Sequence, residues 1–164
     1  TQMIPAAMLM IPLYILAVKL GLIGTWRGLV IAYSVSSIPF SIWMLKGYYD
    51  TIPVELEEAA LIDGTSRMGA FYRIILPLST PSLAICFLFN FMSAWNDYLL
   101  ARIILQKQNM WTWPLGLQSF IMNFRTEWGA YSAAAIMVSV PVMILFFLSS
   151  KYLVSGLTIG SVKG

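Results

Sequence analysis

Long runs of apolar residues, separated by shorter polar segments, dominate the amino-acid sequence. A transmembrane helix needs about 17–25 mostly apolar residues. Four stretches without Lys, Arg, Asp or Glu reach that length, namely Thr1–Val18, Gly28–Leu45, Ile74–Asn96 and Trp128–Ser150. We therefore expect four membrane-spanning helices, near residues 2–20, 28–46, 79–101 and 129–151. The predicted fold class is an all-α membrane protein, a polytopic helix bundle.

The composition supports this class and excludes several functions. The chain of 164 residues is 59% hydrophobic and only 10% charged, whereas soluble domains carry about 25% charged residues. The net charge of +3 is small and the basic residues are scattered, so no nucleic-acid surface is expected. There is no histidine, and the single cysteine, Cys86, lies in an apolar run. We expect no metal site and no catalytic residues.

One segment between the predicted spans, Gly47–Leu78, is long and charged. Pro53 suits the first turn of a helix, and Asp63-Gly64 would end that helix, because glycine adopts the left-handed conformation that follows many helices. Thr65 or Ser66 can cap a second helix, which Pro77 would close. The sequence therefore predicts a helix, a sharp turn and a second helix outside the bilayer. An ordinary solvated loop is the alternative.

Within this segment, Glu58-Ala59-Ala60, Gly64, Ile74 and Leu76-Pro77 form the pattern EAA-x3-G-x9-I-x-L-P. The pattern resembles the EAA loop of ABC importer permeases. The resemblance implies that residues 47–78 are a cytoplasmic coupling loop that docks on an ATPase subunit. The basic residues are divided equally between the two sides of the predicted bundle, so the positive-inside rule does not orient it and the resemblance supplies the orientation.

Two further segments extend the resemblance to binding-protein-dependent carbohydrate permeases of the maltose type. Trp95–Ala101 resembles the fifth span of such permeases, and Tyr152–Gly164 is similar to their C-terminal tail. The resemblance implies a type I ABC importer permease with six spans, of which this chain matches the last four. We therefore expect a single, N-terminally truncated transmembrane domain over residues 1–164 with an extended, cytoplasmic tail at 152–164. The location implied is the inner membrane of a prokaryote.

The resemblance also implies partners and assigns residues to the coupling function. The partners are a cytoplasmic ABC ATPase dimer, a second and different permease subunit, an extracytoplasmic sugar-binding protein and membrane lipid. ATP would bind to the ATPase, because this sequence lacks the G-x-x-x-x-G-K-[ST] phosphate-binding pattern, so no cofactor is expected in the chain. The residues assigned to coupling are Glu58, Ala59, Ala60, Asp63, Gly64, Ile74, Leu76 and Pro77.

Polar residues within the third predicted span indicate a substrate path. Asn90, Ser93 and Asp97 recur at i, i+3 and i+7, which places them on one face of a continuous helix. Polar residues within spans tend to face the bundle interior, although small polar residues also serve helix packing. A further set of aromatic residues could stack on a sugar but more readily forms an interfacial aromatic belt, namely Trp95, Tyr98, Trp111, Trp113 and Trp128.

The function that these features favour is that of a membrane-spanning permease subunit of an ATP-driven sugar importer, without an ATPase site of its own. Three alternatives stay open. One is a permease for a non-sugar solute, because importers share the loop pattern. Another is a non-catalytic membrane scaffold. An intramembrane enzyme is the third and is disfavoured, because an aspartyl protease needs two intramembrane aspartates and only Asp97 lies in an apolar stretch.

Overall fold

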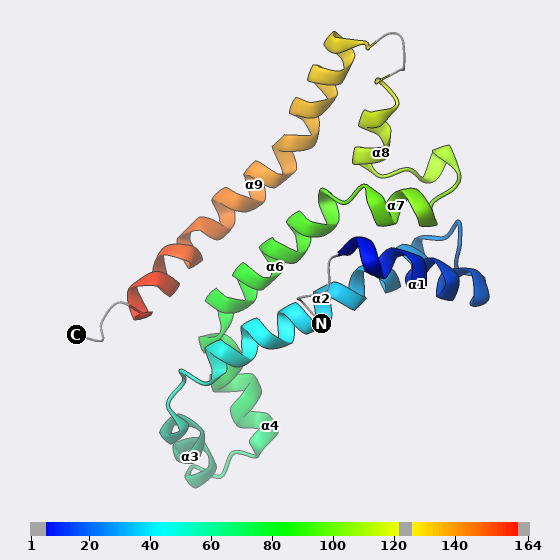
Figure 1. The fold of residues 1–164 in the computed structure, drawn as a ribbon. Coiled ribbons are helices and arrows are strands. Elements are labelled where there is room, and N and C mark those ends of the chain that lie inside the picture. The colour runs from blue at the N-terminus through cyan, green and yellow to red at the C-terminus, as the bar shows by residue number, and fades with distance from the viewer. Residues whose placement is uncertain (1–5, 122–125, 161–164) are drawn as a thin grey trace. The chain divides into compact units, whose positions relative to one another are not determined.

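The chain is helical almost throughout the part that the structure describes. The structure, a computed structural model, describes residues 6–121 and 126–160. Within these residues extended pairing is limited to an isolated bridge between Ile121 and Thr126. The predicted all-α fold class is therefore confirmed (Figure 1).

The helices divide between two compact units. One unit comprises Thr1–Phe40 and Asn90–Ile144, and the other comprises Ser41–Phe89 and Leu145–Gly164. The elements in chain order are α1 (Ala6–Lys19), α2 (Trp26–Tyr49), α3 (Val54–Ile62), α4 (Arg67–Ala70), the π-helical segment η1 (Phe71–Ile75), α5 (Leu76–Leu78), α6 (Thr80–Trp95), α7 (Leu99–Ile104), the 3-10 segment η2 (Gln108–Met110), α8 (Trp113–Gln118) and α9 (Trp128–Gly160).

Two of the described helices are long and apolar enough to cross a membrane by themselves. They are α2 and the part of α9 from Trp128 to Tyr152. They contain the predicted spans 28–46 and 129–151. Helix α1 is apolar but shorter, and residues 2–5 of its predicted span lie outside the described residues.

The third predicted span, residues 79–101, is wrong as a single helix. Helix α6 ends at Trp95, and α7 begins at Leu99 after a break. Two polar side chains compete with the helical hydrogen bonds there, as Asn and Asp commonly do. Asn96 Nδ2 donates to the Met92 carbonyl at 2.8 Å, and Asp97 Oδ2 accepts from the Ala101 amide at 3.0 Å. The chain therefore changes direction between Trp95 and Leu99.

The predicted extended tail is also wrong over most of its length. Helix α9 continues without interruption from Trp128 to Gly160, whereas residues 161–164 lie outside the described part. Glycine lowers helix propensity, but adding residues to an existing helix costs much less than nucleating one. Gly156 therefore does not stop a helix that is already formed.

The core of the first unit lies where α2, α7 and α8 meet. Its buried residues are Leu29, Ala32, Ala101, Ile104, Leu105 and Leu115. A tight turn leads into α2, with Gly21 at φ 65° and Gly24 at φ 72°. The Gly24 amide donates to the Ile104 carbonyl at 2.8 Å, so this turn is fastened to the end of α7.

Candidate functional site

Helix α3 forms the first half of residues 47–78, the segment predicted to be a coupling loop and called the coupling loop below. Pro53 occupies its N-cap position, with φ −59° and ψ 130°, one position earlier than a residue of the first turn. Proline has no N–H to leave unsatisfied at a helix start. Glu55 and Glu57 lie in the first turn, where the helix dipole favours negative charge. Local sequence chemistry thus accounts for where α3 begins.

The turn after α3 is closed by a Schellman motif. The Thr65 amide donates to the Ala60 carbonyl at 3.0 Å, and the Gly64 amide donates to the Leu61 carbonyl at 3.1 Å. Gly64 has a φ of +82°, the left-handed conformation that this motif requires and that glycine adopts at little cost. The predicted role of Gly64 as the turn residue is confirmed.

Helix α4 begins with a side-chain cap and packs closely on α3. Ser66 is the N-cap, and its Oγ accepts from the Gly69 amide at 3.1 Å, which confirms one of the two predicted caps. Ala60 of α3 and Ala70 of α4 are both buried. Their small side chains permit close packing of the two helices, which lie side by side in Figure 1. Ala60 therefore serves packing within the coupling loop.

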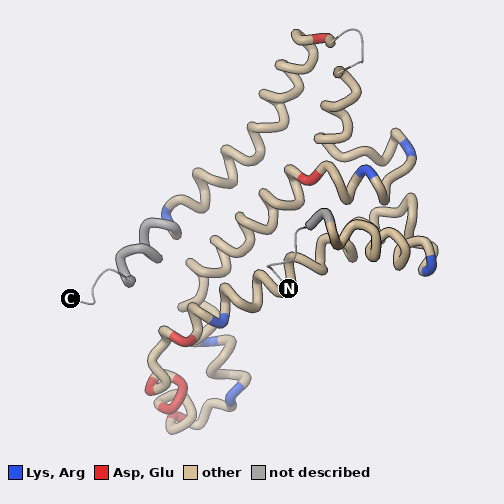
Figure 2. Tube along the Cα trace, viewed as in Figure 1, with Lys and Arg blue, Asp and Glu red and all other residues tan. Residues whose placement is uncertain are grey.

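The outer surface of the coupling loop combines acidic and apolar side chains. Glu58, Ala59 and Asp63 are exposed, and Ile62 is exposed to 85%. Figure 2 shows the acidic residues along α3 and basic residues along the chain from α4 onward. Single exposed apolar residues are normal on protein surfaces, so Ile62 alone does not mark a surface that another protein covers.

The second half of the coupling loop is continuous through Pro77, contrary to prediction. The chain passes from α4 through η1 into α5, and Pro77 lies inside α5. A π-helical segment changes the hydrogen-bond register before the proline, so the helix accommodates Pro77 and does not end there. Ile74 lies in η1 and Leu76 in α5, both partly buried.

The real interruption follows at Ser79. The axes of Arg67–Leu78 and Thr80–Trp95 differ by 69°. Ser79 is fully buried and its Oγ donates to the Ile75 carbonyl at 2.7 Å. The Tyr48 hydroxyl donates to the Leu78 carbonyl at 2.9 Å, which links the end of α2 to this bend.

The three residues of the predicted substrate path do not lie on one helix. Asn90 and Ser93 belong to α6, whereas Asp97 lies in the break that follows. Asp97 Oδ2 accepts from the Tyr33 hydroxyl at 3.1 Å and from the Ala101 amide at 3.0 Å. Asp97, one residue before the N-cap Tyr98, thus bonds the first turn of α7 and connects it to α2.

Sequence reasoning missed a pocket of about 560 Å³ in the first unit. Its lining includes four tryptophans from segments far apart in the sequence, together with a polar residue of η2 and the polar residues that flank α8. The lining includes Trp26, Trp95, Gln108, Trp111, Thr112 and Trp113. The close spacing of Trp111 and Trp113 in the sequence was the available signal, but the contribution of Trp26 depends on the tertiary fold.

The described residues define a class of protein before any comparison is made. They form an apolar helical membrane protein. Its capped helix–turn–helix, α3 and α4, follows the membrane-length helix α2 in the chain and leads into the bent helical pair that ends at Trp95. No group of three His, Cys, Asp or Glu side chains within residues 6–121 and 126–160 could hold a metal ion. These features are typical of a transport or docking component.

Comparison with known families identifies which component this is. Residues 1–159 match the family described as the binding-protein-dependent transport system inner membrane component. The chain therefore belongs to this family of membrane transport proteins.

Individual relatives agree with the family. The chain is 40% identical to the inner membrane ABC transporter permease protein YcjP of Escherichia coli, over 99% of this chain and 58% of that protein. It is 40% identical to the maltodextrin transport system permease protein MdxG of Bacillus subtilis, over 99% of this chain and 59% of that protein. It is 39% identical to the maltose/maltodextrin transport system permease protein MalG of Escherichia coli, over 99% of this chain and 57% of that protein. The chain spans somewhat under two thirds of these relatives.

A solved structure shares the fold. It is a bacterial ABC transporter involved in the import of the acidic polysaccharide alginate, with a TM-score of 0.69 and 26% identity. The match covers 87% of this chain and 55% of that chain. The resemblance to carbohydrate permeases, inferred from the EAA pattern and from Trp95–Ala101, is thereby confirmed.

Proposed function

We propose that the protein containing this chain is the permease subunit of an ATP-driven sugar importer. The observation that carries the proposal is the geometry of the coupling loop. The Schellman turn at Gly64 and the Ser66 cap hold two helices rigidly, and Glu58 and Ala59 stay exposed on α3. A rigid surface of this kind is suited to docking on another subunit and to transmitting its movement.

The coupling loop would work as a lever between the ATPase and the membrane helices. Closure of an ATPase dimer around ATP would displace α3 and α4, and α5 and the bend at Ser79 would pass this movement to α6. The membrane helices would then open the transport path alternately to the two sides of the membrane. ATP itself would stay on the partner ATPase, which places residues 47–78 and the end of α9 in the cytoplasm.

The substrate class is inferred from relatives. Two of the relatives above are named as maltodextrin or maltose permeases, and one solved relative is named for the import of a polysaccharide. A sugar would be delivered by an extracytoplasmic binding protein, and a second, different permease subunit would complete the path. Asn90 and Ser93 are the candidate path residues on α6. A permease for a non-sugar solute is the second candidate.

Charge reversal at Glu58 tests the coupling proposal. The full-length protein is expressed with its ATPase, partner permease and binding protein, and reconstituted into liposomes. Glu58→Lys keeps α3 intact but reverses the charge offered to the ATPase. We expect assembly with the partner permease to be normal. Co-purification of the ATPase, or sugar-stimulated ATP hydrolysis and uptake, should fall strongly.

Asp50→Asn is the matched control in the same loop. The Asp50 carboxylate lies 2.6 Å from Lys46 Nζ on an exposed surface, and exposed ion pairs contribute only about 0–1 kcal/mol. We therefore expect this variant to behave as the unmodified protein. If Glu58→Lys matches Asp50→Asn in ATPase binding and in stimulated hydrolysis, the loop is not a coupling element.

A further inference from the structure

The sequence removes one helical hydrogen bond at the bend of the coupling loop. In a continuous α-helix the carbonyl of Pro77 would accept from the amide four positions further on, which belongs to Pro81. Proline has no N–H, so this bond cannot form. The chain turns at Ser79, where the axes of Arg67–Leu78 and Thr80–Trp95 differ by 69°. The Pro77 carbonyl therefore needs a donor from elsewhere.

Two local hydroxyl groups donate to carbonyls at this bend. Thr80 Oγ1 donates to the Pro77 carbonyl at 2.7 Å, in place of the missing amide. Ser79 Oγ donates to the Ile75 carbonyl, also at 2.7 Å. These bonds join residues three and four positions apart. They stabilise the shape of the bend but do not join it to another helix.

A third hydroxyl group reaches the bend from the end of α2. The Tyr48 hydroxyl donates to the Leu78 carbonyl at 2.9 Å, across 30 positions of the sequence. Tyr48 is the last residue but one of α2, and Leu78 is the last residue of α5. The two residues therefore lie at the two ends of the coupling loop, and their hydrogen bond closes the loop at its base.

The two ends of the coupling loop differ in how the chain connects them to the membrane-length helices. On the second side, α4, η1 and α5 follow one another without a gap and lead to the bend before α6. On the first side, residues 50–53 separate α2 from α3 and belong to no helix. Without the Tyr48 bond, a displacement of α3 would reach α2 through this non-helical link.

We infer that Tyr48 is a positioning residue that holds the two ends of the coupling loop together, so that one movement of the loop displaces α2 and α6 in concert. The inference rests on the proposed function, in which an ATPase moves residues 47–78. The Tyr48 hydroxyl gives α2 a second connection to the loop, at the same bend from which α6 begins.

The surface position of this hydrogen bond separates positioning from stability. The bond is exposed, and Leu78 is 44% exposed. When the Tyr48 hydroxyl is removed, water can bond to the Leu78 carbonyl, so no buried polar group is left unsatisfied. Tyr48→Phe also keeps the aromatic ring. We therefore expect this variant to fold, to assemble and to bind the ATPase normally, while the two ends of the loop separate more often.

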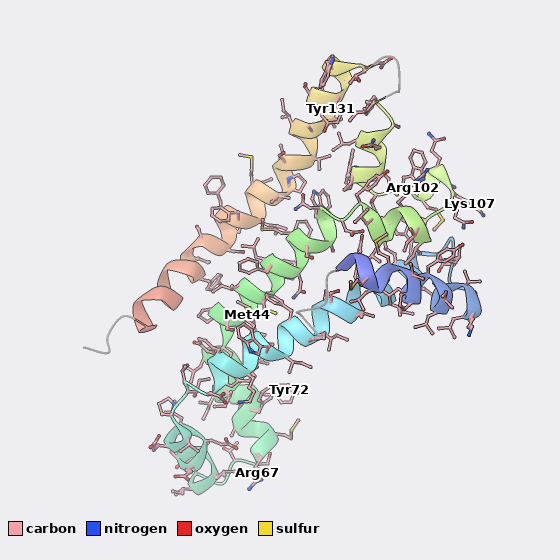
Figure 3. The ribbon with its side chains drawn as sticks, in the orientation of Figure 1. Met44, Arg67, Tyr72, Arg102, Lys107 and Tyr131 are labelled. Carbon is pink, nitrogen blue, oxygen red and sulfur yellow. The ribbon has the colours of Figure 1, made fainter. Side chains whose placement is uncertain are left out.

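Distances between two spin labels test this separation directly. The full-length protein is assembled with its partner permease and ATPase in lipid nanodiscs and labelled at Gly47→Cys and Arg67→Cys, after other reactive cysteines of the complex have been replaced by serine. Gly47 lies on α2 with open space around it, and Arg67 is exposed on α4. Tyr131→Phe is the matched control, because Tyr131 lies on α9, outside the coupling loop (Figure 3).

Tyr48→Phe should broaden the distance distribution, with the separated form about twofold to tenfold more populated, the change expected for one lost hydrogen bond. Uptake of radiolabelled maltotriose per ATP hydrolysed, measured in liposomes with the binding protein, should fall by a factor in the same range. Thermal unfolding and co-purification of the ATPase should be unchanged. Tyr131→Phe should match the unmodified complex in all four measurements.

The same measurements separate this inference from the proposed function. Unchanged distances in Tyr48→Phe would overturn the inference and leave the proposed function standing, as would broadened distances with unchanged uptake per ATP. A loss of thermal stability large enough to explain the lower uptake would also overturn it, because Tyr48 would then have a structural role alone. If the unmodified complex takes up no sugar with ATP, the proposed function is wrong, and this inference fails with it.

Discussion

Replacement of Gly64 changes the backbone of the coupling loop without changing its charge. Gly64 has a φ of +82°, and a Cβ added there would meet nothing within 4 Å. A side chain is therefore disfavoured by backbone conformation and not by collision. An ordinary residue in the left-handed region costs about 1–2 kcal/mol, and strained backbone positions cost about 1–3 kcal/mol. β-branched residues fall at the upper end.

The substitutions should therefore rank by their tolerance of the left-handed conformation. Gly64→Asn should be mild, because asparagine adopts this conformation more readily than other residues. Gly64→Ala should be intermediate and Gly64→Val most severe. A cost of about 2 kcal/mol changes the ratio of formed to opened turn by roughly 30-fold. Opening of the turn breaks the two backbone hydrogen bonds to the Ala60 and Leu61 carbonyls and releases α3 from α4.

Two measurements on the reconstituted complex follow this series. Hydrogen exchange reports the opening of the turn through the amides of α3, and sugar-stimulated ATP hydrolysis reports coupling. Both should change in the order Asn, Ala, Val. Gly47→Ala is the matched control, because Gly47 lies in helix α2 and also has open space around it. There alanine should be neutral or stabilise by up to about 1 kcal/mol.

Gly64→Val and Gly47→Ala should differ in both measurements. If Gly64→Val couples hydrolysis to sugar as well as Gly47→Ala does, while exchange shows that the turn has opened, then the geometry of the coupling loop is irrelevant to coupling. If the turn does not open in Gly64→Val, the argument from backbone conformation is itself wrong.

Further substitutions test the first unit. Asp97→Ala removes the acceptor for the Ala101 amide and the Tyr33 hydroxyl, so it should lower the free energy of unfolding by about 2 kcal/mol, and Tyr33→Phe by about 1 kcal/mol. Thermal unfolding in nanodiscs measures both changes, and equal stability of the two variants and the unmodified protein would refute the role assigned to Asp97. Gly28→Ala should destabilise by about 1–3 kcal/mol, because the new Cβ would overlap the Leu22 carbonyl oxygen, whereas Gly129→Ala meets open space and should be neutral in the same assay. Asn90→Leu should reduce or alter sugar uptake with assembly intact, and unchanged uptake across several sugars would leave Asn90 a packing role.

Local chemistry explains why the coupling loop could be predicted from the sequence. A positive φ at Gly64 and a cap at Ser66 depend on residues within a few positions of each other. The same holds for the start of α3 near Pro53. Propensity and capping rules describe such interactions well, because they need no knowledge of what lies across the fold.

The sequence predictions were wrong where one local preference overrides another, or where contacts between residues distant in the sequence determine the structure. Pro77 was expected to end a helix, but the π-helical segment before it absorbs the irregularity. Asp97 was placed on the face of Asn90 by helical periodicity, yet its carboxylate is committed to Ala101 and to Tyr33, a residue 64 positions away. The pocket depends on Trp26 meeting Trp111 in space, which spacing along the chain does not reveal.

Under the proposed function, a movement of residues 47–78 would reach α6 through the bend at Ser79. An exposed, flexible joint would absorb such a movement, whereas Ser79 is fully buried and bonded to Ile75. The carbonyl of Leu78 is bonded to Tyr48, so the same joint is also tied to the end of α2. Two helices are thus held at one fixed point next to the coupling loop.

Between the turn at Gly64 and the bend at Ser79 lies the π-helical segment Phe71–Ile75. The π geometry is uncommon, and its single turns often occur at functional sites. Under the proposed function, a load on Glu58 would pass through α4 and η1 before it reaches Ser79. The turn at Gly64 is closed by two backbone hydrogen bonds, and the bend at Ser79 is held by two hydrogen bonds from hydroxyl groups. The segment Phe71–Ile75 lies between these two fixed points and would carry an ATPase movement from one to the other.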